Sequence, residues 1–156
     1  MLSLLERDAR RTPTQLGQML GLPPEEVARR VEAYEKGGVI LGYKAIVNED
    51  KLELDRVKAV IEVRITPERE GGFDRTAERI ANFEEVTSCF LMSGAYDILL
   101  FVEARTLHQV ASFVASKLAT LERVQSTATH FMLKTYKDQG VKMSSAEPEG
   151  RIAVTP

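Results

Sequence analysis

One short polar stretch contains residues that could bind a small molecule, Ser93, Gly94, Ala95, Tyr96 and Asp97. Gly94 permits a tight turn between two apolar segments, and the backbone N–H groups of such a turn can hold a carboxylate. The carboxylate of Asp97 could pair with an ammonium group. Turns also use Gly and Asp for purely local reasons. The stretch is therefore a candidate ligand site and, equally, a candidate structural turn.

Residues that usually carry catalysis or metal binding are sparse. The two histidines, His108 and His130, have no Cys, Asp or Glu at ligand spacing. Cys89 is the single cysteine, so it has no disulfide partner within the chain, and we expect it to be a small apolar strand residue. A nucleophile elbow, a phosphate-binding glycine loop and a zinc spacing are also absent. We expect no catalytic residues, no metal and no cofactor.

Composition limits the class of protein. With 156 residues, of which 44% are hydrophobic and 28% charged, the chain can bury one sizeable core or two small ones. No apolar run approaches the roughly 18 residues of a membrane span, and the start does not read as a secretory signal, so we expect a soluble, cytoplasmic protein with no membrane partner. Because the net charge is −2, the chain as a whole is not basic, and any contact with DNA must come from a local group of cations. Residues 1–47 carry seven Lys and Arg against six acids. This small excess of positive charge has the sign that DNA binding requires.

Three helices are predicted in residues 1–47. The first spans 2–11, the second is capped by Thr14 and ended by Gly21, and the third has Pro24 in its first turn and ends at Gly37. The apolar positions at helical spacing in the second and third are Leu16, Met19, Leu20, Val27, Val31 and Tyr34. A helix-turn-helix fits this pattern, although another three-helix bundle fits the periodicity equally well.

The rest of the chain predicts a strand, a linker and a second domain. Residues 39–47 are β-branched and predict one strand, and 48–55 form a polar linker. Residues 56–137 predict strands at 57–65, 86–92, 96–104 and 124–135, with helices around 73–80 and 107–121, the latter capped by Thr106. This βαββαβ order is that of a ferredoxin-like α+β domain. Residues 138–156 predict a tail, in which only 151–154 could add an edge strand.

The predicted sheet has too much apolar surface for its two helices, which can cover only one face. Ile98, Leu100 and Val102 point to one side of their strand, and Leu99 and Phe101 point to the other. The uncovered side would be a large exposed apolar patch. We therefore predict a homodimer that packs sheet against sheet.

In order and spacing, these segments resemble the Lrp/AsnC (feast/famine) family of transcriptional regulators over nearly all of residues 2–137. The segments that carry the resemblance are 16–22, 27–31, 38–43 and 93–100, the last of which resembles the family's Gly-x-Tyr-Asp signature. The resemblance implies an N-terminal helix-turn-helix (winged-helix-like) domain followed by a ferredoxin-like domain. It also implies a sequence-specific DNA-binding regulator that senses a small effector, commonly an amino acid, and forms homodimers and often octamers. The implied effector site lies between dimers, at residues 93–97.

The resemblance also assigns candidate DNA contacts. Two residues of the third helix would read the DNA and the other cations would contact phosphates. The candidates are Arg29, Arg30, Lys36, Lys44, Arg10 and Arg11. Each of these charges, taken singly, could be no more than a solvated side chain.

The chain departs from the family pattern at three places. The first helix is short, and Pro23 stands where the family commonly has a Ser that caps the third helix. Glu25 and Glu26 suit the helix dipole but face phosphates poorly. Glu122-Arg123-Val124 replaces the family's Pro-Gly-Val before the last strand. Two alternatives stay open: an enzyme similar to siroheme decarboxylases, which share a related architecture, and an effector-binding assembly module that has lost DNA binding.

Overall fold

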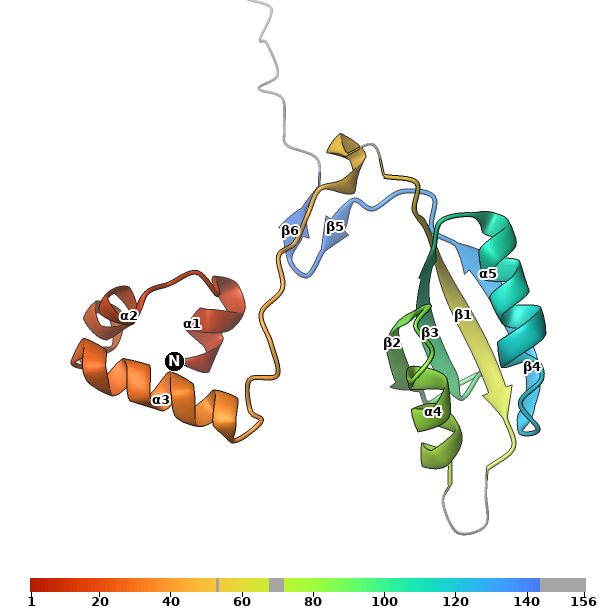
Figure 1. The fold of residues 1–156 in the computed structure, drawn as a ribbon, viewed down its shortest axis with the longest axis horizontal. Coiled ribbons are helices and arrows are strands. Elements are labelled where there is room, and N and C mark those ends of the chain that lie inside the picture. Colours follow the sequence, from red (N-terminus) through yellow and green to blue (C-terminus); the bar gives the residue numbers. More distant parts are fainter. Residues whose placement is uncertain (53, 68–71, 144–156) are drawn as a thin grey trace, which may run out of the picture. The chain divides into compact units, whose positions relative to one another are not determined.

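The computed structural model describes residues 1–52, 54–67 and 72–143 (Figure 1). The chain divides into two compact units, Met1–Val47 and Asn48–Pro156. Within the described ranges, no helix combines the length and the apolar character needed to cross a bilayer.

The N-terminal unit consists of α1 (Leu2–Arg7), α2 (Pro13–Leu20) and α3 (Pro24–Lys36). Each helix contributes one buried side chain to a small core, formed by Leu5, Leu16 and Val27. The predicted extension of the first helix to residue 11 is wrong, because the backbone of Asp8 is already extended (φ −156°). The three-helix prediction itself is confirmed.

The N-terminus of α2 is capped by Thr12, so the prediction of Thr14 was wrong. The Thr12 hydroxyl accepts a hydrogen bond from the Gln15 backbone N–H (3.3 Å), and the Gln15 side chain accepts one from the Thr12 N–H (2.9 Å). Pro13 then occupies the first helical position, where its missing N–H has no helical partner to lose. This reciprocal capping box satisfies two N–H groups that would otherwise lack partners.

A tight turn joins α2 to α3. Gly21 ends α2 in the left-handed conformation (φ 68°), and α3 begins at Pro24, both as predicted. Gly17, buried within α2, bonds through its carbonyl to the Leu22 N–H (3.0 Å). A Cβ atom at Gly17 would lie 2.5 Å from the Leu22 carbonyl oxygen. The close approach of the turn to α2 therefore requires glycine at this position.

The strand predicted at residues 39–47 does not form. The Val39 and Ile40 N–H groups both bond to the Tyr34 carbonyl at the end of α3 (2.8 and 3.1 Å). The segment then runs without regular structure, and its Leu41 side chain is 93% exposed. A strand needs a neighbouring strand to bond its backbone, and the described part of the chain places none beside this segment.

The C-terminal unit contains a four-stranded antiparallel sheet and two helices. In chain order these are β1 (Val57–Ile65), α4 (Asp74–Ala81), β2 (Val86–Leu91), β3 (Ile98–Ala104), α5 (Leu107–Phe113), the single π-helical turn η2 (Val114–Leu118) and β4 (Val124–Phe131). The strand order is β2-β3-β1-β4. The predicted ferredoxin-like arrangement is confirmed, as is the cap of α5 by Thr106.

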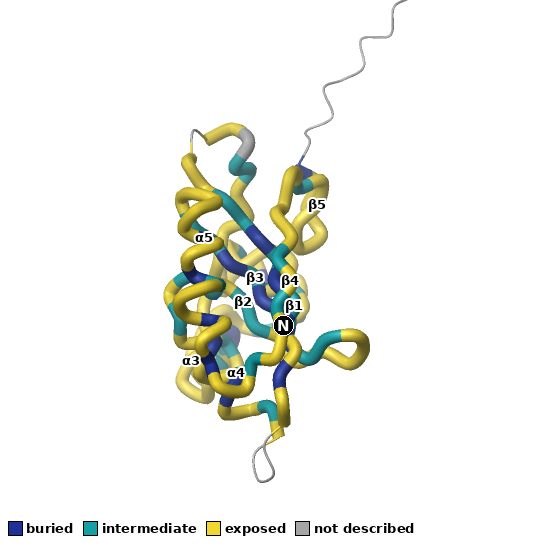
Figure 2. The backbone as a smooth tube through the Cα atoms, turned by 90° about the vertical axis from the view of Figure 1, so that its right-hand side faces the viewer, coloured by how far each residue is buried: buried dark blue, intermediate teal, exposed yellow. Residues whose placement is uncertain are grey.

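Both helices pack on one face of this sheet (Figures 1 and 2). Buried residues alternate along β1 and β3, which Figure 2 shows in dark blue. They pack against Ile80 of α4 and against Phe113, Leu118 and Leu121 of the α5–η2 region. Among the described residues of this unit, no helix covers the opposite face, which carries Leu99, Phe101 and Phe90.

Two short elements lie outside this sandwich. The linker includes the 3-10 turn η1 (Glu49–Lys51), and residues after β4 form a small hairpin of β5 (Lys137–Asp138) and β6 (Val141–Lys142). The Asn48 side chain donates a hydrogen bond to the Met143 carbonyl (2.7 Å), so the hairpin is fixed to the start of the linker. Residues 138–143 thus differ from the predicted unstructured tail, and the strand predicted at 151–154 lies outside the described residues.

Candidate DNA-binding and ligand-binding sites

The cations of α3 differ in whether they are already paired. Arg30 forms an ion pair with Glu26, one turn earlier on the helix, and Lys36 does so with Glu32 at 2.6 Å. Arg29 is exposed and has no ion-pair partner among the residues described. Its guanidinium could therefore reach a base or a phosphate without breaking an existing contact.

The other predicted DNA contacts come from two further segments of the N-terminal unit. Arg11 lies 3.7 Å from the Asp8 carboxylate, and the same carboxylate accepts a bond from the Arg10 backbone N–H (3.1 Å). Lys44 is exposed in the irregular segment that follows α3. Asp8, between α1 and α2, thus contacts the backbone of Arg10 and the side chain of Arg11.

The start of α3 has the features expected from the sequence. Pro23 is its N-cap and provides no side-chain cap, and Glu25 and Glu26 stand in the first turn. The helix carries four glutamates against three cations. Because the helix is slightly acidic, its DNA affinity must depend on a few well-placed cations.

The 93–97 stretch joins β2 to β3. Gly94 has φ 145°, a conformation that side-chain-bearing residues rarely adopt, so the turn itself requires glycine. Ser93, Gly94 and Ala95 are exposed, whereas Tyr96 and Asp97 are half-buried. The Met92 N–H bonds to the Asp97 carbonyl (2.8 Å) and closes the turn.

The Asp97 carboxylate already has a structural partner. Its Oδ2 accepts a hydrogen bond from the backbone N–H of Ile65, at the end of β1 (2.9 Å), and its own N–H donates to the Val63 carbonyl (3.0 Å). The sequence suggested bonds within the turn, but the carboxylate instead ties the turn to the neighbouring strand. A ligand ammonium group would have to use its remaining acceptor positions.

The end of β1 is irregular, and it joins the turn to a second region. The pairing of β1 with β4 shifts between Arg64 and Ile65, so that Gln125 is an extra residue on β4. The Thr66 N–H bonds to the Arg123 carbonyl (2.9 Å), and the Gln125 side chain donates to the Thr66 hydroxyl (2.9 Å). Such bulges commonly redirect side chains beside binding sites.

A cavity of about 260 Å³ lies at this same end of the domain, between α4 and the segment before β4. Its lining residues are Arg75, Thr76, Arg79, Leu121, Glu122 and Arg123. The sequence analysis did not single out Arg75 and Arg79. They lie four residues apart on α4 beside its apolar positions, a pattern that ordinary solvated charges share.

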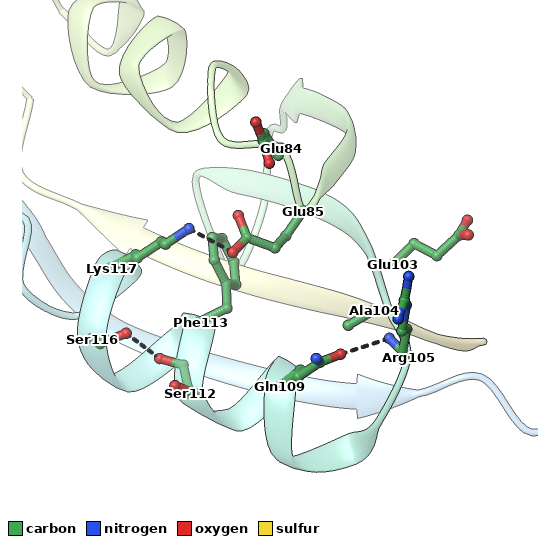
Figure 3. A pocket seen from close by; sticks show the side chains of 10 residues that line it. All are labelled: Glu84, Glu85, Glu103, Ala104, Arg105, Gln109, Ser112, Phe113, Ser116 and Lys117. Atoms are coloured by element: carbon green, nitrogen blue, oxygen red, sulfur yellow. Dashed lines mark hydrogen bonds and ion pairs between the residues drawn. The ribbon is translucent and has the colours of Figure 1, made fainter. Parts of the chain in front are cut away.

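A larger cavity, of about 410 Å³, opens at the opposite end of the domain, between α5 and the start of β2 (Figure 3). Most of its polar groups bond one another. Lys117 pairs with Glu85 at 2.6 Å, and the Gln109 side chain accepts from the Arg105 N–H at 2.9 Å. Desolvation, the largest single cause, would raise the pKa of Glu85, but the hydrogen bond from Lys117, a backbone hydrogen bond and the charge of Lys117 together outweigh it and lower that pKa. The cavity is thus held together by internal pairs.

The residues considered for catalysis have ordinary surroundings. His130 lies 3.4 Å from the Glu62 carboxylate on the uncovered sheet face, and His108 is exposed on α5. Cys89 packs against the core, as predicted, and burial raises the pKa of its thiol. Over the described ranges, no three His, Cys, Asp or Glu side chains gather to form a metal site.

The two units each match a known protein family model. Residues 58–141 match the Lrp/AsnC ligand binding domain, and residues 1–35 match the AsnC-type helix-turn-helix domain. The chain belongs to the Lrp/AsnC family. The resemblance inferred from residues 2–137 is therefore confirmed, and so is the fold of a helix-turn-helix domain followed by an α+β ligand-binding domain.

Individual relatives of this Lrp/AsnC chain are transcriptional regulators. The HTH-type transcriptional regulator YugG of Bacillus subtilis (strain 168) is 40% identical over 157 residues, covering 100% of this chain and 95% of the relative. The regulatory protein AsnC of Haemophilus influenzae is 29% identical and covers 83% of this chain and 84% of its own length. The solved regulator NMB0573 of Neisseria meningitidis, in complex with L-Met, has a TM-score of 0.65 at 26% identity and covers 88% of each chain.

Proposed function

We propose that this Lrp/AsnC regulator acts in the cytoplasm as a homodimer that binds double-stranded DNA through α3, and that an amino acid bound at the 93–97 turn modulates this binding. The observation that carries the proposal is the turn between α2 and α3. Gly17 allows the Leu22 backbone to approach α2 closely, and this contact fixes α3 with Arg29 exposed on it. A helix presented in this way is the reading element of helix-turn-helix proteins.

Few cations per subunit imply that two subunits read the DNA together. Arg30 and Lys36 are already paired within α3, and Arg11 lies beside Asp8, so Arg29, Arg10 and Lys44 would supply most of the attraction to phosphate. A two-fold dimer doubles these contacts and reads two half-sites about one helical turn apart.

The uncovered sheet face supports the homodimer. Phe90 is 49% exposed there, and its ring packs edge-to-face on Phe101, with centroids 6.1 Å apart. Leu99 and Val60 extend the apolar surface across β3 and β1. A second copy of the chain would bury this surface by a self-complementary contact. Assembly of such dimers into octamers is a further expectation.

The turn supports an amino-acid effector. Exposed backbone N–H groups around Ala95 could hold the effector's carboxylate, and Asp97 retains acceptor positions for its ammonium group. A related regulator has been solved with L-Met bound. By this argument the effector of the present chain is also an amino acid.

The proposal is tested by a mobility-shift titration of the protein on the DNA upstream of its own gene, at low salt, with and without each of the twenty amino acids. We expect a shift that weakens steeply with salt and that one or a few amino acids alter. Sedimentation at micromolar concentration should show a dimer. Absence of any salt-dependent shift would leave only the assembly module, and tetrapyrrole absorbance of the purified protein would favour the enzyme.

A further inference from the structure

We propose that residues 134–143, which include the β5–β6 hairpin, contact the phosphate backbone of the DNA that α3 binds. We call this segment the basic hairpin, because it carries three lysines and one acidic residue in a chain whose net charge is −2. The proposal rests on the proposed function, since it needs α3 to hold the DNA. It goes beyond that function by assigning a DNA contact to the C-terminal unit.

Two lysines of the basic hairpin lie opposite each other. Lys137 of β5 pairs with Lys142 of β6, and paired residues of antiparallel strands place their side chains on the same face. Both residues are exposed, and neither has an ion-pair partner among the residues that the structure describes. Like charges directly opposite each other on neighbouring strands are destabilising. A DNA phosphate bound by both ammonium groups would replace this repulsion with two attractive contacts.

The turn at the tip of the hairpin is strained. Gln139 has φ 42° and Gly140 has φ 88°, the two positive values that a type I′ turn requires. Within the described ranges, Gln139 is the only residue other than glycine with a positive φ, a conformation that is unfavourable for its side chain. Strained residues of this kind are concentrated at binding sites and other functional positions. The exposed amide of Gln139 can donate a hydrogen bond to a phosphate oxygen.

The base of the basic hairpin is fixed, although an isolated two-stranded hairpin is barely stable. Met143 is buried, its N–H bonds to the Tyr136 carbonyl (3.0 Å), and its carbonyl accepts the bond from the Asn48 side chain (2.7 Å). The Lys134 Nζ lies 5.2 Å from the centre of the Tyr136 ring. The lysines therefore extend from an ordered element, which reduces the conformational entropy that they lose on binding.

The covalent chain limits the distance between the basic hairpin and a predicted DNA contact. Asn48, to which the hairpin is bonded, directly follows Val47, the last residue of the N-terminal unit (Figure 1). It is four residues after Lys44. Four extended residues span at most about 14 Å, however the two units are oriented. DNA carries one negative charge per about 1.7 Å of its axis, so a duplex that contacts Lys44 has further phosphates near Asn48.

The test is fluorescence anisotropy of the full chain with two labelled duplexes, one with the sequence upstream of its gene and one with that sequence scrambled, at several salt concentrations. The double variant Lys137→Gln with Lys142→Gln should weaken binding about tenfold and lower the salt dependence by about two counterions per subunit. The loss should be equal on the two duplexes, because phosphate contacts carry no sequence information. Thermal unfolding should show no loss of stability, since the variant removes a repulsive pair.

A charge-matched control is Arg79→Gln with Arg123→Gln. Both arginines are exposed and have no ion-pair partner in the described part of the chain. Arg123 precedes the start of β4, which pairs with the end of β1, whereas the hairpin follows the end of β4, which pairs with the start of β1. This control should change the affinity by about twofold at most, because solvent and salt screen distant charges.

An equal loss in the control and the hairpin variant would overturn the proposal, because net charge alone would then explain both. The variant Lys137→Arg with Lys142→Arg keeps the charge and should bind like the parent. A tenfold loss in this arginine variant would also overturn the proposal, since phosphate contacts need the charge and not the lysine itself.

Chemical acetylation of lysines, measured by mass spectrometry, locates the contact directly. Lys137 and Lys142 should be protected when DNA is bound. Lys117, which pairs with Glu85 on the helical side of the sheet, should react equally with and without DNA. Hairpin lysines that stay reactive in the DNA complex would overturn the proposal and leave the proposed function standing. A parent protein that binds neither duplex would overturn both.

Discussion

Arg29 and Arg30 are neighbours on α3, but only Arg30 is paired, with Glu26. We predict that Arg29→Ala weakens specific DNA binding about tenfold and lowers the dependence on salt by about one counterion per subunit. The matched control is the double variant Glu26→Gln with Arg30→Gln, which removes the pair and keeps the net charge. It should change the affinity by about twofold at most. Fluorescence anisotropy at several salt concentrations measures both, and an equal loss in the two variants would contradict the prediction.

The ion pair of Glu85 with Lys117 should make part of the protein's stability depend on pH in the acid range. Although desolvation opposes it, the bond from Lys117 lowers the pKa of Glu85 below its ordinary value of 4.5. The folded state therefore favours the carboxylate. This stabilisation is fully present above the ordinary pKa and is lost as the pH falls through the lowered value. Because both side chains are partly exposed, its size is at most about 1 kcal/mol.

Urea denaturation measures this effect. Glu85→Gln should lower the free energy of unfolding at neutral pH. When the pH falls from about 5 to about 3, this free energy should decrease less in Glu85→Gln than in the parent protein. Glu84→Gln, at the adjacent exposed carboxylate, should behave like the parent. A parallel pH profile for Glu85→Gln and the parent would show that the pair does not contribute.

Single-residue roles were predictable only where they are local. The sequence indicated that Gly94 makes a turn and that Thr106 caps a helix, because turn and cap chemistry depends on adjacent residues. It did not indicate that Asp97 bonds to Ile65, 32 residues away in the chain. Nor did it indicate the cavity between α4 and the segment before β4, since Arg79 and Arg123 line it together only after the domain folds.

The helix-turn-helix element depends on Gly17. We predict that Gly17→Ala destabilises the N-terminal unit by about 2 kcal/mol, because the added Cβ would lie 2.5 Å from the Leu22 carbonyl oxygen. This cost exceeds the gain of about 1 kcal/mol in helix propensity. Thermal unfolding measures the change, and Gln18→Ala at the adjacent exposed position is the control. Unchanged stability of Gly17→Ala would mean that the turn can move away from α2.

The turn between β2 and β3 allows the structural and ligand roles of Asp97 to be separated. Asp97→Ala removes the acceptor of the buried Ile65 N–H and should cost about 1 to 3 kcal/mol. Asp97→Asn can still accept that bond but carries no charge, so it should keep most of the stability and lose the effector response. The two variants are compared by thermal shift and by the DNA titration with effector. An Asn variant with a normal response would make Asp97 a purely structural residue.

At the scale of elements, the sequence was most reliable where hydrophobic periodicity was long. α3, β1 and β3 are found close to their predicted bounds, because one face of each is buried. The 39–47 segment misled the prediction, since β-branched residues favour a strand but cannot supply the partner that a strand needs. The cap of α2 was misplaced because Pro13 takes the first helical position.

For the whole molecule, we predict a homodimer whose interface is the sheet face that carries Phe90, opposite the helices. Phe90→Asp places a charge in the proposed interface and should convert the dimer to a monomer, because the carboxylate would lose its water there. Leu107→Asp changes a similarly exposed apolar residue, 57% exposed, on the helical side and should leave the dimer intact. Sedimentation velocity at micromolar concentration distinguishes the two results. A Phe90→Asp variant that stays dimeric would place the interface elsewhere.

The overall architecture was predictable because strands with two apolar faces and helices with one leave few arrangements. Ile98 and Leu100 had to face the helices if Leu99 was to face outward, and the structure places them so. Which polar side chains meet at the two ends of the sheet follows from register shifts such as the one at Ile65. A single sequence contains no sign of such a shift.

That irregular end of β1 has a consequence for how the regulator could respond to its surroundings. Ile65 and Thr66 donate successive backbone N–H groups, one to the Asp97 carboxylate and the other to the Arg123 carbonyl. The 93–97 turn and the segment before β4 are thus joined through two adjoining peptide groups. If a ligand at the 93–97 turn alters the segment before β4, thermodynamic reciprocity requires a partner that binds this segment to change the ligand's affinity by the same factor. Such a protein would respond to its effector with a sensitivity that depends on what else it has bound.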